Sequence, residues 1–146
     1  TPYFVPDRRT QRLLKAAASQ GADVRLLVPR KSDIKLARWA AQAAYAGLLN
    51  GGVRMYEYLP RMLHAKTIVV DSNYATVGTA NIDYRSFFLN YELNLFTRDS
   101  ALCRQLTSQF QKDLKTAEEI NTGKWNRRSW GDQLFELVGW LARRWL

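Results

Sequence analysis

The chain has 146 residues, of which 47% are hydrophobic and 24% charged, a composition typical of a globular domain that excludes wholesale disorder. A chain of this length buries roughly 68–70% of its unfolded surface, so it needs no disulfide or structural metal. A net charge of +9 predicts an anionic partner, either nucleic acid or a phospholipid surface.

Cys103 is the only cysteine and His64 the only histidine of the chain. One cysteine excludes an intrachain disulfide and a cysteine-based zinc cluster, and one histidine excludes the usual histidine-rich metal sets. No uninterrupted apolar run reaches the ~18–20 residues that a membrane-spanning helix needs.

Helices and strands are expected to alternate through the first part of the chain, at 7–20, 24–28, 34–49 and 53–58 in the order helix, strand, helix, strand. Asp7 is suited to cap the first helix, and Ser32 or Asp33 the second. This alternation predicts an α/β fold in which helices flank a mixed β-sheet.

The middle of the chain predicts a β-hairpin, with a buried strand at 67–70, a turn at 71–73 and a return strand at 74–78. A further strand is expected at 92–97. A long helix is expected from 101 to about 119, because apolar residues recur there at helical spacing.

The last residues differ in composition, since four of the five tryptophans follow Lys124 and alternate with arginines. We therefore divide the chain into a domain at 1–123 and a basic, Trp-rich amphipathic tail at 124–146. The tail is expected to form a helix whose apolar side consists of Leu134, Leu137, Val138, Leu141 and Trp145. This helix either packs on its own domain or lies on a membrane surface, with Trp at the interface and Arg toward anionic head groups.

The segment from His64 to Asn81 has the pattern H-x-K-x4-D-x6-G-T-x-N. Residues two apart in a strand point to the same side, so His64 and Lys66 are expected to project together. The hairpin then returns Thr79 and Asn81 beside them. Such a group of side chains suits a phosphodiester, because Lys66, Thr79 and Asn81 can donate to its oxygens.

His64 has the chemistry for the reacting group, since a histidine pKa near ~6.5 allows it to act as nucleophile, base or acid near neutrality. Such a histidine needs a partner that orients its second ring nitrogen. Glu92, on the strand after the hairpin, is the candidate.

This pattern resembles the HKD motif of the phospholipase D superfamily at every defining position. Asn90-Tyr91-Glu92 and the segment Asn81-Ile82-Asp83-Tyr84-Arg85-Ser86-Phe87 also resemble that superfamily. Over nearly its whole length the chain is similar to the C-terminal half of bacterial cardiolipin synthases. The resemblance implies a fold that is one half of a phospholipase D-like bilobal unit.

The resemblance also implies a mechanism without metal or cofactor, in two steps through a phosphohistidine. On this reading His64 is the general acid and base, and Lys66 and Asn81 hold the phosphate. Thr79 supports the phosphate, Glu92 orients His64, and Asp71 belongs to the catalytic motif as a hydrogen-bonding brace.

The chain carries one HKD motif, whereas this chemistry needs two histidines. Either two copies pair, or an N-terminal half with a second motif is missing. The start at Thr1-Pro2-Tyr3, without Met, favours the second explanation. The isolated chain is then expected to be inactive.

The function expected is a phosphatidyltransferase that makes cardiolipin by transesterification, with phosphatidylglycerol or a similar phospholipid as substrate. The expected location is the cytoplasmic side of a bacterial inner membrane, bound peripherally to its anionic surface. The Trp-rich tail argues mildly against nucleic acid as partner. Two alternatives remain, namely a single-motif homodimeric phosphodiesterase or nuclease acting on DNA, and a non-catalytic remnant.

Overall fold

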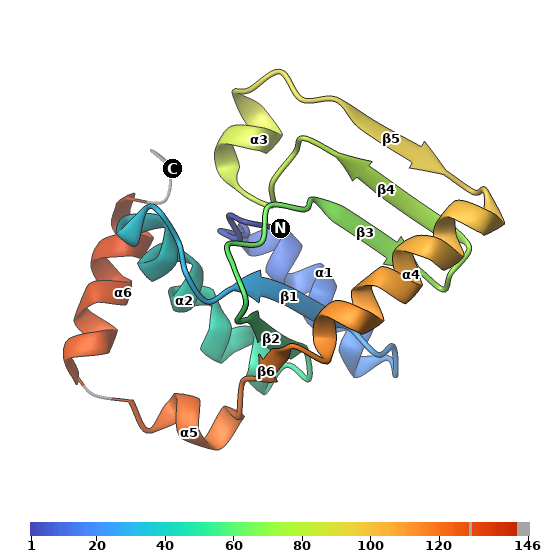
Figure 1. Ribbon diagram of the computed structural model, residues 1–146. Coiled ribbons are helices and arrows are strands. Elements are labelled where there is room, and N and C mark those ends of the chain that lie inside the picture. The colour runs from blue at the N-terminus through green and yellow to red at the C-terminus, as the bar shows by residue number, and fades with distance from the viewer. Residues whose placement is uncertain (129, 143–146) are drawn as a thin grey trace.

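The computed structural model of the chain describes residues 1–128 and 130–142. Its elements are α1 (Arg8–Ser19), β1 (Arg25–Pro29), α2 (Lys35–Asn50), β2 (Arg54–Tyr58), β3 (Thr67–Val70), β4 (Tyr74–Gly78), α3 (Tyr84–Phe88), β5 (Asn94–Thr97), α4 (Ser100–Leu114), β6 (Ala117–Glu119), α5 (Thr122–Asn126) and α6 (Trp130–Ala142). The predicted α/β class is confirmed, but the strands form two three-stranded sheets rather than one mixed sheet (Figure 1).

The first sheet has the order β1-β2-β6 and is mixed. β1 and β2 are parallel, and α2 supplies the crossover that parallel strands require. β6 pairs antiparallel to β2. Ion pairs join β6 to the sheet, because Arg30 contacts Glu57 at 2.7 Å and Glu118 at 2.5 Å, and Arg54 contacts Glu119 at 3.0 Å.

The second sheet has the order β3-β4-β5 and is antiparallel throughout. α4 packs against β3 and β4, where Ala75 is buried. The prediction of a strand at 67–70 is confirmed, but the prediction that this strand is buried is wrong. Ile68 and Val70 point to the face away from Ala75 and remain 49% and 51% exposed, because no described helix covers that face.

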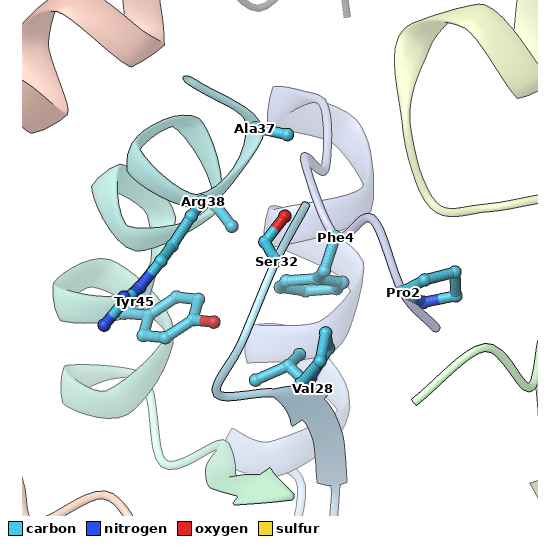
Figure 2. Close-up of a pocket in the computed structure, with 9 residues that line it drawn as sticks. Pro2, Phe4, Val28, Ser32, Ala37, Arg38 and Tyr45 are labelled. Atoms are coloured by element: carbon cyan, nitrogen blue, oxygen red, sulfur yellow. The ribbon is translucent and has the colours of Figure 1, made fainter. Parts of the chain in front are cut away.

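The main hydrophobic core lies between α2 and the first sheet. Phe4 of the N-terminal segment, Val28 of β1 and Tyr45 of α2 point toward one another there (Figure 2). Their exposed fractions are only 1–3%, and full burial of such a side chain contributes roughly 1.5–3 kcal/mol to stability. The same N-terminal segment pairs with the loop after β4, since the Val5 N–H donates to the Ile82 carbonyl at 2.8 Å. This segment therefore ties the core to the second sheet.

Two predicted helix ends differ from the structure. α2 has Ile34 at its N-cap without a side-chain cap, because Asp33 instead accepts hydrogen bonds from the Tyr3 hydroxyl at 2.8 and 2.9 Å. The helix predicted at 101–119 ends at Leu114, and the last three residues of that range form β6. Pairing with β2 overrides the local helical pattern, which contains no helix-breaking residue at 115–116. The cap predicted at Asp7 is confirmed by a 2.6 Å bond from the Thr10 N–H.

The predicted tail helix is confirmed as α6, which packs along α2 (Figure 1). The Trp39 and Phe135 rings stack with centroids 4.7 Å apart. Gly139 lies so close to α2 that any Cβ there would collide with the main chain at Trp39 and Ala40. The predicted boundary between residues 123 and 124 falls inside α5, and Trp145 lies outside the described residues. The division into two domains stays a prediction.

Candidate functional site

The β3–β4 hairpin brings the two ends of the motif together. The Gly78 N–H donates to the Lys66 carbonyl at 3.2 Å, so the strand pairing extends one residue before β3. Asp71 and Ser72 form the turn with φ values of 50° and 55°, as a type I′ turn requires. Gly78 is needed for the approach of β5, because any Cβ there would collide with the Leu93 carbonyl and with Asn94.

His64 lies in the loop before β3, with its side chain exposed, and not in a strand as the two-residue spacing predicted. The period-two argument therefore does not apply to it. Lys66 contacts His64 through the main chain instead, because the Lys66 Nζ donates a hydrogen bond to the His64 carbonyl oxygen at 3.0 Å. In the described part of the chain, the imidazole itself has no hydrogen-bond partner. The ammonium is thus held next to the histidine, while the imidazole is free to meet a substrate.

Glu92 lies next to Thr79, at the end of β4. Its carboxylate accepts hydrogen bonds from the Thr79 hydroxyl and, at 3.4 Å, from the Asn90 amide. The Thr79 hydroxyl oxygen also accepts the Leu93 N–H at 2.9 Å. Within residues 1–128 and 130–142, neither a hydrogen bond nor an ion pair joins Glu92 to the imidazole. The orienting role of Glu92 therefore stays a prediction.

Asn81 follows the same strand end and is fixed by its main chain. Its N–H donates to Ser86 Oγ at 3.1 Å, and the Ser86 N–H donates to Asp83 Oδ1 at 2.7 Å. Asp83 thereby caps α3 and is only 4% exposed. This chain of hydrogen bonds holds Asn81 at the end of the sheet where β3 begins.

The charged groups at this end of the sheet interact with one another. Burial lowers the pKa of Lys66, and the nearby Glu92 and Asp83 carboxylates act in the opposite direction. The bond from Thr79 lowers the pKa of Glu92, helped by Ser86, Asn90 and Lys66. Burial raises the pKa of Asp83, and its bonds to Ser86 oppose that rise. A cation and two carboxyl groups therefore share one site.

The structure assembles most of the predicted site residues, but not all of them. Lys66, Thr79, Glu92 and Asn81 gather where β3 begins and β4 ends, next to the N-terminal segment and α3 (Figure 1). Asp71 lies in the turn at the opposite end of the hairpin, five residues from Lys66, or about 16 Å along a strand. It is therefore outside this cluster, and its role as a hydrogen-bonding brace stays a prediction.

Sequence reasoning did not single out Ser86, which links Asn81 to Asp83 through both its hydroxyl and its N–H. The signal was present, because an Asp three residues before a Ser at the start of a short helix is a typical cap pattern. For a metal ion, the described residues offer no group of three or more His, Cys, Asp or Glu side chains. Lys66 and the Asn81 amide can donate hydrogen bonds to an anion here, whereas the Thr79 hydroxyl proton is already donated to Glu92.

Residues 1–114 match the protein family described as "Cardiolipin synthase, PLD-like domain". A cardiolipin synthase of Clostridium perfringens is 44% identical over 129 residues, which are 88% of this chain and 27% of that protein. Cardiolipin synthase 2 of Bacillus anthracis is 44% identical over 128 residues, or 88% of this chain and 25% of that protein. The chain thus spans about a quarter of the length of these curated relatives.

Two solved structures share the fold. Nuc from Salmonella typhimurium, a phospholipase D family member, has a TM-score of 0.71 at 19% identity and covers 82% of this chain and 78% of its own. NucT from Helicobacter pylori has a TM-score of 0.63 at 21% identity and covers 82% of this chain and 79% of its own. At these identities the likeness concerns the fold alone.

Proposed function

Because the chain belongs to the family of cardiolipin synthase, PLD-like domains, we propose that it is one catalytic half of a phosphatidyltransferase. The complete protein transfers a phosphatidyl group from phosphatidylglycerol, or a similar phospholipid, to the hydroxyl of another lipid and so makes cardiolipin. The chain spans only about a quarter of the length of its curated relatives, so this activity belongs to the complete protein.

The reaction exchanges one phosphorus–oxygen bond for another in two steps. A histidine nitrogen of the other half attacks phosphorus, the bond to the leaving alcohol breaks, and His64 gives that alcohol a proton. The acceptor hydroxyl then gives its proton to His64 while its oxygen attacks the phosphohistidine and releases the first histidine. His64 ends each cycle as it began, and no metal or cofactor takes part.

The remaining side chains of the site bind the phosphate group or orient His64. Lys66 and Asn81 hold the non-bridging oxygens of the phosphate, where a fixed cation and an amide stabilise the charge of the transition state. Thr79 supports this group, and Glu92 orients His64 once both halves are together. Asp71 braces the hairpin from its turn.

The observation that carries the proposal is the Lys66 bond to the His64 main chain at 3.0 Å. It places a cation and the only imidazole of the chain at one end of a hairpin. Thr79 and Glu92 are bonded to each other at that same end. A phosphate ester bound by the Lys66 ammonium would lie next to His64, which must give a proton to the leaving alcohol and take one from the acceptor alcohol.

We further propose that the N-terminal half of the complete protein covers the open face of the β3-β4-β5 sheet. Ile68, Val70, Tyr74 and Phe96 share that face, and Phe96 is 78% exposed. An apolar sheet face of this kind is typical of an interface. The relatives are more than three times as long as this chain, so they contain enough additional sequence to cover it.

The membrane is the second proposed partner. The side of α6 that faces away from α2 carries an exposed stripe of Trp130, Leu134, Leu137, Val138 and Leu141. No helix among the described residues is long and apolar enough to cross a membrane. We therefore propose that α6 lies on the surface of an anionic bilayer, peripherally and on the cytoplasmic side.

The test is phosphatidyl transfer in vesicles that contain labelled phosphatidylglycerol. The complete protein, or this chain mixed with a separately made N-terminal half, should form labelled cardiolipin, and this chain alone should form none. A reconstituted pair without activity would contradict the proposal and favour a non-catalytic remnant. Tight binding to DNA without binding to vesicles would instead favour the nuclease alternative.

A further inference from the structure

A cavity of about 200 Å³ opens beside Asn81. Four polar side chains of one continuous segment line it, namely Asn81, Asp83, Arg85 and Asn90. They include two amides, one carboxyl group and one guanidinium. Together these groups can donate and accept several hydrogen bonds within a small volume.

The rest of the cavity wall is mainly apolar. Val5 of the N-terminal segment and Ala37 of α2 are buried there, while Ile34 is 43% exposed at the rim. The Tyr3 ring completes the wall, with its hydroxyl bonded to Asp33. The cavity thus has polar groups from one segment and apolar surface from two others.

Hydrogen bonds hold the polar wall in place before any ligand binds. The Ser86 hydroxyl oxygen accepts a hydrogen bond from the Asn81 N–H, and the Ser86 N–H donates to Asp83. The Val5 N–H donates to the Ile82 carbonyl at 2.8 Å. Asp83 is only 4% exposed, and its burial raises its pKa. A wall fixed in this way loses little entropy when a ligand is bound.

We propose that this cavity binds the glycerol group of the phospholipid that reacts at Asn81, an inference that rests on the proposed phosphatidyl transfer. Hydroxyl groups of a small polyol can pair with the amides, the carboxyl group and the guanidinium. Its carbon atoms can contact Val5 and Ala37. The cavity is below the ~300–1,000 Å³ that is typical of drug-sized ligands, which suits a three-carbon group.

The wall carries one group of each sign, Asp83 and Arg85, so it has no excess charge that would favour an anionic or a cationic head group. A glycerol hydroxyl interacts favourably with both side chains. Asn81 belongs both to this wall and to the proposed phosphate site, so a glycerol bound here would lie next to the reacting phosphorus. It would be either the leaving group of the donor lipid or the attacking alcohol of the acceptor lipid.

Two variants of the complete protein test the cavity. Ile34→Trp fills it from the exposed rim, so the hydrophobic core is not overpacked. Asp83→Asn removes the carboxylate but keeps the α3 cap, because Asn caps helices as well as Asp. Leu13→Trp on α1 is the matched control, since Leu13 is 62% exposed and does not line the cavity. Melting temperatures verify that all three variants are folded.

The assay separates the two sources of glycerol. One arm compares phosphatidylglycerol with phosphatidylmethanol as donor, with water as acceptor. The other arm compares glycerol with methanol as acceptor, at a fixed phosphatidylmethanol donor. Ile34→Trp and Asp83→Asn should lower the preference for glycerol about tenfold in at least one arm, as expected for the loss of one or two hydrogen bonds, while Leu13→Trp changes neither arm.

A loss in the donor arm assigns the cavity to the leaving group, and a loss in the acceptor arm assigns it to the attacking alcohol. Unchanged preferences in both variants would overturn the inference. Binding of sn-glycerol 3-phosphate, measured by NMR titration, keeps the test separate from the proposed function. If the wild type transferred no phosphatidyl group, the proposed function would fail. Even then, binding that is lost in Ile34→Trp and kept in Leu13→Trp would support the cavity, and equal binding or none would overturn it.

Discussion

The Lys66 ammonium donates a hydrogen bond to the main-chain carbonyl oxygen of His64 at 3.0 Å. This bond folds the lysine side chain back over the loop that carries the histidine. The same ammonium interacts electrostatically with Glu92 and Asp83. Lys66 therefore connects the loop before β3 with the groups at the end of β4.

Replacing Lys66 with Met should lower phosphatidyl transfer by the complete protein ~10²–10³-fold, because a fixed charge that stabilises the transition state is lost. Met keeps the length of the side chain and removes only the charge and the donors. Lys31→Met is the control, since Lys31 is exposed and outside the site. Equal rates for the Lys66 variant and the wild type in a vesicle assay would contradict the role of Lys66.

Replacing His64 with Ala or Gln should lower turnover by at least ~10²–10⁴-fold, which is typical for the loss of a general acid or base. A donor with a good leaving group, such as a phosphatidyl nitrophenol, needs no proton on departure. In the first step, measured as nitrophenol release in a single turnover, the loss with this donor should be much smaller. An equally large loss with both donors would argue against His64 as the general acid.

Gly78→Ala should destabilise the protein by about 1–3 kcal/mol, because the new Cβ collides with the main chain of β5. Gly47→Ala provides a matched control inside α2, where a Cβ would meet nothing within 4 Å. That change should stabilise the protein by roughly 0.5–1 kcal/mol. Urea unfolding of the two variants measures both effects, and a neutral Gly78→Ala would show that β5 does not need this close approach.

Asp83→Asn should change the pH dependence of stability. Burial raises the pKa of Asp83 in the folded state, so the folded protein binds the proton more tightly than the unfolded chain does. The contribution of Asp83 to the free energy of unfolding is fully present below the ordinary aspartate pKa. It is lost as the pH rises through the raised pKa of the folded state. The variant should therefore gain stability relative to the wild type as the pH increases through that interval.

Urea unfolding between about pH 3.5 and 7 measures this difference, since the ordinary aspartate pKa is about 3.9. A constant difference between variant and wild type would mean that burial does not perturb Asp83. Asp33→Asn serves as the control, because Asp33 is exposed and accepts its hydrogen bonds from the Tyr3 hydroxyl at the surface.

Leu137→Glu should weaken the binding of the complete protein to phosphatidylglycerol vesicles roughly tenfold or more, because burying one Leu contributes about 1.5–3 kcal/mol. Leu137 is 52% exposed on the α6 stripe. Leu13→Glu on α1 introduces the same charge at a residue that is 62% exposed and outside the stripe. Sedimentation with vesicles compares them, and equal losses would point to charge alone as the cause.

Residue spacing singled out the candidate site residues, whose catalytic roles stay predictions. The H-x-K-x4-D-x6-G-T-x-N pattern singled out His64, Lys66, Thr79 and Asn81, and the structure gathers the last three at one end of a hairpin with His64 adjoining them. The α1 cap at Asp7 and the α6 stripe also followed from local patterns. These features are readable because caps, turns and helical faces depend on residues only a few positions apart.

Tertiary contacts decided the rest. Residues 117–119 join β2 as a strand because Arg54 and Arg30, far away in sequence, pair with Glu119 and Glu118. Asp33 does not cap α2, because its carboxylate accepts a hydrogen bond from the Tyr3 hydroxyl. The Val5 N–H donates to the Ile82 carbonyl, and this bond positions the cavity wall beside Asn81. Each of these contacts joins segments whose separation along the chain carries no periodic signal, so only the folded protein fixes where the segments meet.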